Sequence, residues 1–186
     1  MNGDTMKKYE LQPTDLTTPN GKPFFRVVAL RNFGEVLKGD KGGYVESEDN
    51  LSNKGNCWVS NNARVFENAR VFGNSLVYGE AWVFGNSLVF GEAWVFGDSR
   101  VFGGAQVFGD SWVYGGARVS GTARVSGKAW AYDTTKRTDG LVSLAQTDTC
   151  THYGIDSGGT DYYGTSNPSQ EADWNYAYCP KCGEKL

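Results

Sequence analysis

Twelve valines recur at every sixth position between residues 59 and 125 of this 186-residue chain. Alanine, serine or cysteine stands two residues before each valine, and glycine stands two residues after most of them. A period of six fits neither an α-helix, with about 3.6 residues per turn, nor a flat strand, with about 2. Units this short bury an apolar surface only by stacking on one another. The repeat therefore predicts stacked units with the valines and small residues inside.

This unit, small-x-Val-x-Gly-x, resembles the hexapeptide repeat of left-handed parallel β-helices. The resemblance implies an all-β fold in which each unit is one side of a triangular coil, so that about 18 residues complete a turn. Glycine would then occupy the corners, where φ is positive, and Asn61 takes that place in the first unit. The alternative is a run of ordinary antiparallel strands, which the strict period disfavours.

With three units per turn, residues 18 apart share one column on the outside of the coil. One face then gathers mostly aromatic side chains. They are Trp58, Leu76, Tyr78, Trp94, Phe96, Trp112, Tyr114 and Trp130. An exposed apolar patch of this size is rare on monomers, so we expect this face to be the interface of a homo-oligomer, a dimer or a trimer. Alternatively, the rings stack along the coil and cover their own backbone.

The other two faces carry arginines beside aromatic residues. One column holds Arg64, Trp82, Arg100 and Arg118, and the other includes Arg70 and Arg124. Arginine beside Phe or Trp suits an anionic, planar ligand such as a nucleotide. These six residues are therefore candidate ligand-binding residues, although arginines on a β surface are often simply solvated.

The charge balance argues against a duplex nucleic acid as partner. The whole chain has a formal net charge of −3, and residues 57–130 carry six basic against five acidic side chains. This is not the strongly basic surface of duplex-binding proteins. We also expect no membrane partner, because no apolar stretch is long enough to span a bilayer and the first twelve residues lack an apolar signal segment. The expected location is the cytoplasm.

The segment before the repeat, residues 1–50, is not periodic and is expected to cap the open end of the β-helix that occupies residues 51–132. Residues 24–30 read as a strand. Val45 and Leu51 stand six residues apart and are expected to begin the coil. A cap would cover the strand edge that an open solenoid end exposes.

This segment also carries a motif that resembles a family. Residues 28–34 read VALRNFG and residues 39–46 read GDKGGYVE, before the first small-x-Val units. The motif resembles that of phage and prophage hexapeptide-repeat proteins, although Asn32 stands where Asp is commoner. The resemblance implies a β-helix and a phage context, with the host cytoplasm as location. It supplies no catalytic residues.

The composition changes after the repeat. Residues 133–149 are polar and read as a linker, and residues 150–186 are predicted to form a small zinc-binding segment. Its predicted ligands are Cys150, His152, Cys179 and Cys182. Four nitrogen and sulfur ligands make a closed structural zinc site, whereas a disulfide or free thiols are the alternatives. Cys57 takes the small inward position of its unit and is expected in the core.

These features favour a non-enzymatic binding protein that self-associates and acts on a host component. Acyltransferases of the β-helix class resemble one another in using a histidine, but the single histidine here, His152, is a predicted zinc ligand. No loop interrupts the repeat, and loops commonly build catalytic sites. The alternatives are a protein that sequesters a nucleotide signal between subunits, a scaffold or virion component and, least favoured, an acyltransferase-like enzyme.

Overall fold

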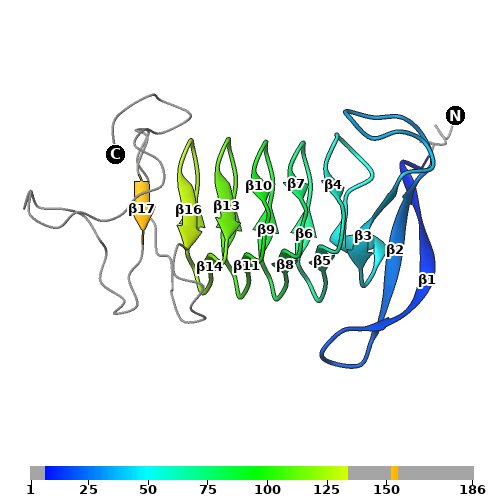
Figure 1. Ribbon diagram of the computed structural model, residues 1–186, viewed down its shortest axis with the longest axis horizontal. Helices are drawn as coiled ribbons and strands as arrows, with labels where there is room; N and C mark the ends of the chain where they lie inside the picture. The colour runs from blue at the N-terminus through cyan, green and yellow to red at the C-terminus, as the bar shows by residue number, and fades with distance from the viewer. Residues whose placement is uncertain (1–6, 134–151, 155–186) are drawn as a thin grey trace, which may run out of the picture.

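The structure is a computed structural model that describes residues 7–133 and 152–154. It is a parallel β-solenoid whose N-terminal end is closed by a hairpin (Figure 1). Apart from the short 3₁₀ helix η1 (Glu48–Asn50), all regular structure in the described residues is β-strand. The expected all-β solenoid is therefore confirmed. The hand of the coil stays a prediction.

The N-terminal segment forms a hairpin that joins the solenoid edge to edge. Strand β1 (Tyr9–Thr17) pairs antiparallel with β2 (Pro23–Ala29), which pairs antiparallel with β3 (Lys41–Val45). Strand β3 then pairs in parallel with the first coil of the repeat, with Val45 opposite Val65. An isolated parallel bridge likewise joins Leu51 to Val71. The prediction that Val45 and Leu51 begin the coil is thus confirmed.

Each repeat unit contributes one short strand. The strands are β4 (Trp58–Val59), β5 (Arg64–Val65), β6 (Arg70–Val71), β7 (Leu76–Val77), β8 (Trp82–Val83), β9 (Leu88–Val89), β10 (Trp94–Val95), β11 (Arg100–Val101), β12 (Gln106–Val107), β13 (Trp112–Gly115), β14 (Arg118–Val119), β15 (Arg124–Val125) and β16 (Trp130–Asp133). After them, β17 (His152–Gly154) pairs in parallel with β16.

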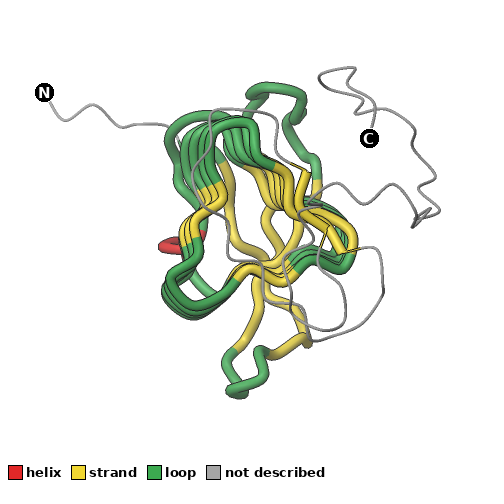
Figure 2. The backbone as a smooth tube through the Cα atoms, turned by 90° about the vertical axis from the view of Figure 1, so that its left-hand side faces the viewer, coloured by secondary structure: helices red, strands yellow, loops and turns green. Residues whose placement is uncertain are grey.

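Every third strand joins the same sheet, so the coil has three sides. The seven-stranded sheet has the order β1-β2-β3-β5-β8-β11-β14, the six-stranded sheet β17-β16-β13-β10-β7-β4 and the four-stranded sheet β15-β12-β9-β6. Pairs within the repeat are parallel and join residues 18 apart, such as Trp82 and Arg100. This excludes the antiparallel alternative for the repeat. Viewed along the solenoid, successive coils overlie one another (Figure 2).

The core consists of the stacked valines and the small residues before them. All twelve valines from Val59 to Val125 are fully buried, as is Cys57. Three of the four buried serines in these positions, Ser75, Ser87 and Ser111, donate their hydroxyls to carbonyls of the coil, whereas the hydroxyl of Ser99 has no partner among the described residues. Ser87 Oγ, for example, donates to the carbonyls of Phe84 at 2.8 Å and Val101 at 3.3 Å. Small inward residues therefore leave room for the turn, and the three bonded serines link two sides of the triangle.

Glycine is favoured at most corners for two reasons. Gly91 has a φ of +74°, in the region that L side chains rarely adopt, and a Cβ there would lie 2.8 Å from the amide nitrogen of Gly109 in the next coil. Asn61 and Glu67 occupy corners of the first units with φ of +56° and +57°. The corners therefore allow the coils to stack at hydrogen-bond distance.

The cap packs against the first coil through buried groups. Phe33 lies edge-on to Trp58 with 5.3 Å between ring centroids, so Trp58 is only 5% exposed. Lys8 is fully buried, and its Nζ donates to the carbonyl of Cys57 at 2.8 Å. Through these contacts the described part of the N-terminal segment covers this end of the solenoid. No helix in the described ranges is long and apolar enough to cross a membrane.

Candidate ligand-binding surface

Four arginines and two aromatic residues form one transverse line across the seven-stranded sheet, which we call the arginine row. Its members are Arg26, Tyr44, Arg64, Trp82, Arg100 and Arg118, on β2, β3, β5, β8, β11 and β14. Each member lies directly opposite the next in the register of the sheet. The row therefore runs along the solenoid from the hairpin to β14, the last strand of this sheet. Neighbouring members lie one strand spacing apart, about 4.8 Å.

From Arg26 to Arg100 the guanidinium groups of the row alternate with rings, and these three arginines make cation–π contacts. The guanidinium carbon of Arg26 lies 4.6 Å from the ring centroid of Tyr44. Arg64 and Arg100 lie over the ring of Trp82, at 5.1 and 5.6 Å. Since Arg64 comes from the coil before Trp82 and Arg100 from the coil after it, the indole is held between them. Its faces are occupied, and a ligand base cannot stack on them.

The arginines of the row have no carboxylate partner among residues 7–133. The two ion pairs found in that range, Lys7–Glu48 and Lys22–Glu46, involve other residues. The Nε atoms of Arg26 and Arg64 are shielded from solvent and make no hydrogen bond. An unpaired buried donor is unfavourable by about 1–3 kcal/mol. The row thus holds cationic groups whose hydrogen-bonding capacity the described part of the protein does not use.

A second line, the phenylalanine row, runs beside the arginine row on the same sheet. It consists of Phe66, Phe84 and Phe102, whose rings stack with centroids 5.1 Å apart and planes within 5°. Because the ring faces are used in stacking, the rings turn their edges outward, and aromatic edges are electropositive. Phe66 is buried beneath Phe24, whereas Phe84 and Phe102 are half-buried.

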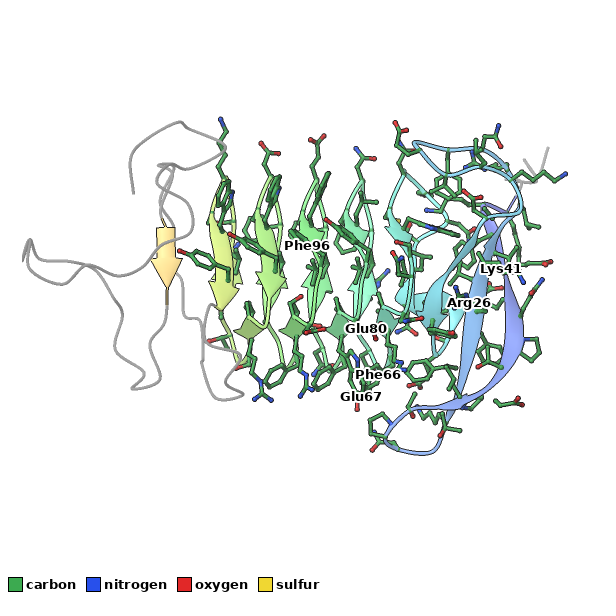
Figure 3. The ribbon with its side chains drawn as sticks, in the orientation of Figure 1. Arg26, Lys41, Phe66, Glu67, Glu80 and Phe96 are labelled. Atoms are coloured by element: carbon green, nitrogen blue, oxygen red, sulfur yellow. The ribbon has the colours of Figure 1, made fainter. Side chains whose placement is uncertain are left out.

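The two corners of this sheet differ in charge. The corner on the arginine side carries Glu80 and Asp98, both exposed. The corner on the phenylalanine side begins with Glu67, whose carboxylate is engaged by Asn20 Nδ2 at 3.0 Å and by the amide of Gly85 at 2.8 Å. It continues with the neutral residues Asn86, Gly104 and Thr122. Figure 3 shows Phe66 and Glu67 near the lower edge of the solenoid and Arg26 on the hairpin.

The structure separates the six candidate ligand-binding residues into two groups. Arg64, Trp82, Arg100 and Arg118 lie together in the arginine row, as their column predicts. Arg70 and Arg124 lie on the four-stranded sheet, in β6 and β15, with the strands of Leu88 and Gln106 between them. That separation is about 14 Å at the usual strand spacing, so these two arginines do not share one small site.

Sequence reasoning missed Arg26 and Tyr44 as members of the row. Tyr44 precedes Val45 as Arg64 precedes Val65, and extending the repeat backwards from that valine would have found it. Arg26 belongs to an antiparallel hairpin. Its place opposite Tyr44 follows from the pairing of these strands, which the six-residue period does not predict. The row is therefore longer than the repeat alone indicates.

The aromatic face on the six-stranded sheet is organised as two stacked ladders. Trp94, Trp112 and Trp130 stack at 5.3 and 5.4 Å, with planes within 8°. Tyr78, Phe96, Tyr114 and Tyr132 stack at 4.8 to 5.4 Å. Leu76 lies opposite Trp94 in the register, and Trp58 is covered by Phe33. The rings stack along the coil, which is the alternative to a subunit interface that the sequence left open. The homo-oligomer stays a prediction.

The predicted zinc ligands Cys150, Cys179 and Cys182 lie outside the described residues. The backbone of His152 begins β17, opposite Trp130 of β16, so this strand extends the six-stranded sheet. Within residues 7–133 and 152–154, no group of three or more His, Cys, Asp or Glu side chains is placed to hold a metal ion. The zinc segment stays a prediction.

Comparison with known proteins does not indicate a function for this chain. No protein-family model and no curated protein matches the chain.

Proposed function

We propose that this chain is a non-catalytic binding protein whose solenoid presents the arginine row to a phosphate-bearing ligand with a planar apolar part, the chemistry of a nucleotide. The observation that carries the proposal is the row itself. Four aligned guanidinium groups have no carboxylate partner among the described residues, and a row of aromatic edges runs beside them.

The geometry suits a ligand that carries phosphate groups. Guanidinium presents a planar fork of donors that matches a phosphate with two parallel hydrogen bonds. Trp82 holds Arg64 and Arg100 in place before a ligand arrives, which reduces the side-chain entropy lost on binding. The rigid parallel strands beneath fix the distance between the cations. A preorganised row of this kind suits recognition of a repeated negative charge.

Binding rather than catalysis is proposed because the repeat part of the row, from Arg64 to Arg118, offers cations and an indole but no general base or nucleophile. Guanidinium groups donate hydrogen bonds and accept none. In the phage context that the N-terminal motif implies, the ligand would be a nucleotide-type molecule of the host. Self-association through the aromatic face would bring a second arginine row into the same assembly.

The test is equilibrium binding of a panel of mononucleotides, cyclic dinucleotides and short oligonucleotides by calorimetry at low salt. The site variant is Arg100→Gln/Arg118→Gln. The matched control is Arg70→Gln/Arg124→Gln, which changes the same position of the unit on another sheet, where Gln106 already stands. We expect binding that the site variant weakens and the control keeps. No binding by any member of the panel would overturn the proposal.

A further inference from the structure

We infer that the ligand of the arginine row is a single strand of nucleic acid lying along the solenoid axis. This inference rests on the proposed function and names the ligand class of the same site. It follows from the length of the row, from the pairing of the two rows and from the charge of the corners.

The length of the row exceeds what a mononucleotide can contact. Arg26 and Arg118 are five strand spacings apart, so the cations span about 24 Å. A mononucleotide reaches one or two of the four guanidinium groups. A single strand covers that distance with about four to seven nucleotides, depending on how far its bases unstack. A linear ligand is therefore the one that uses the whole row.

The pairing of the two rows matches a strand that has phosphates on one side and apolar bases on the other. Each phenylalanine of the second row stands two residues after a member of the arginine row, so both side chains point to the same face of the sheet. The two rows therefore lie about 7 Å apart. Phosphates on the arginine row would place bases over Phe84 and Phe102. Polyphosphate and acidic polysaccharides have no apolar groups to place there.

The charge of the corners sets the side on which the bases lie. Glu80 and Asp98 flank the arginine side and repel an anion that strays toward that corner. The phenylalanine side is neutral from Asn86 onward, because Gly104 and Thr122 follow it in the column. The strand is thus held between a repelling corner and an apolar row.

The recognition of this strand would be largely independent of base sequence. The ring faces of Trp82 are covered by arginines and those of Phe84 by its neighbours, so only ring edges meet the bases. The row carries no side-chain amide in its repeat part to read a base edge. Contacts to the phosphates would therefore supply most of the affinity, which makes binding dependent on salt.

Fluorescence anisotropy with labelled oligothymidylates of increasing length tests the inference, with thymidine monophosphate as competitor and a hairpin duplex for comparison. Four phosphate contacts on a single strand predict a slope of about −3 in a plot of log K against log salt. In Arg100→Gln/Arg118→Gln, we expect that slope to fall to about −1.4 and the affinity to fall about 25-fold at about 0.1 M salt. In Arg70→Gln/Arg124→Gln, both should stay near the wild-type values.

Three results would overturn the inference. If thymidine monophosphate binds as tightly as the long oligonucleotide, the proposed function is kept but the ligand is not a single strand. A duplex that binds as well as the single strand would lead to the same conclusion. Equal losses in the site variant and the control would show diffuse electrostatic attraction without a row. Urea unfolding of both variants establishes that each is folded before its affinity is compared. If no probe binds, the proposed function fails as well.

Discussion

The carboxylate of Glu67 accepts a 2.8 Å hydrogen bond from the backbone amide of Gly85, which occupies the same corner one coil later. Its other oxygen accepts from Asn20 Nδ2 at the turn of the hairpin, at 3.0 Å. Glu67 therefore links the hairpin to the next coil of the solenoid. It does so from a backbone φ of +57°, which a residue with a Cβ adopts at a steric penalty of about 1–2 kcal/mol.

Glu67→Ala and Glu67→Gly separate these two effects. Both variants lose the two side-chain hydrogen bonds, but only glycine removes the steric penalty of the left-handed backbone. We expect Glu67→Ala to be less stable than Glu67→Gly by about 1 kcal/mol in urea unfolding. Equal stabilities would mean that the corner at Glu67 carries no backbone penalty.

Asn50 is a fully buried side chain that joins the first coil to the second. Its Oδ1 accepts from the amides of Glu46 and Ser47, and its Nδ2 donates to the carbonyls of Glu67 and Ala69. Asn50→Asp replaces the donor with an oxygen that faces two carbonyls. We expect a loss of about 3 kcal/mol in unfolding free energy at neutral pH, since buried polar groups lose their partners.

The matched control for that substitution is Asn68→Asp. The Asn68 Nδ2 donates to Asn86 Oδ1 at 3.0 Å on the exposed corner, where water replaces the lost partner. We expect a change within about 0.5 kcal/mol. Comparable losses in the two variants would contradict a special role for the buried amide.

The period of the sequence predicted most of the solenoid because every coil repeats one physical requirement. Valines six apart had to face one core, and the columns of residues 18 apart follow from three sides per turn. The clustering of Arg64, Trp82, Arg100 and Arg118 was predictable for this reason. The burial of Cys57 in place of alanine was predicted correctly in the same way.

The contacts of the cap were not predictable from the period, because they join segments with no common repeat. Lys8 reaches the carbonyl of Cys57 across 49 residues of chain, and Phe33 covers Trp58 from a loop. The cover on Trp58 matters for the aromatic face, whose predicted interface includes that residue. The exposed part of that face therefore begins at Leu76, one coil after Trp58.

The corner glycines allow the backbone penalty and the steric contact to be measured separately. Gly121 has a φ of +64°, and no atom of the described residues lies within 4 Å of a Cβ built there, whereas a Cβ on Gly91 would lie 2.8 Å from the amide nitrogen of Gly109. We expect Gly121→Ala to lose about 1 kcal/mol and Gly91→Ala clearly more, because the next coil must move. Thermal or urea unfolding checks the order, and the reverse order would contradict close coil stacking.

The stability of the cap should depend on pH through Glu46. Partial burial raises the pKa of this carboxyl, but hydrogen bonds from Lys22 and from the backbone of Glu67 outweigh it and lower the pKa below the usual glutamate value. A lowered folded pKa contributes stability that is fully present above the unfolded pKa and is lost as the pH falls through the folded one.

Comparison with Glu46→Gln isolates that contribution. We expect the wild type to be more stable than Glu46→Gln at neutral pH, and the difference to shrink as the solution is made more acidic than the ordinary glutamate pKa. Urea unfolding at successive acidic pH values measures it. A difference that grows on acidification would mean that burial dominates at Glu46 and that its pKa is raised.

Trp82 is expected to act as a positioning residue for the arginine row, because its ring holds Arg64 and Arg100 by cation–π contacts. Each contact is worth about 0.5–1 kcal/mol at an exposed site, so Trp82→Leu should weaken oligonucleotide binding roughly 5- to 30-fold. Leucine already stands at this position of the unit at Leu76 and Leu88, and we therefore expect the variant to fold.

Trp94→Leu is the control for Trp82, because it removes a stacked indole from the same position of the unit on the six-stranded sheet. It should lower the unfolding free energy by a similar amount and leave the affinity for oligonucleotide unchanged. The salt slope distinguishes positioning from contact: Trp82→Leu should keep the slope of the wild type, since all four arginines remain, while losing affinity. An unchanged affinity in Trp82→Leu would show that the guanidinium groups need no indole to hold them in place.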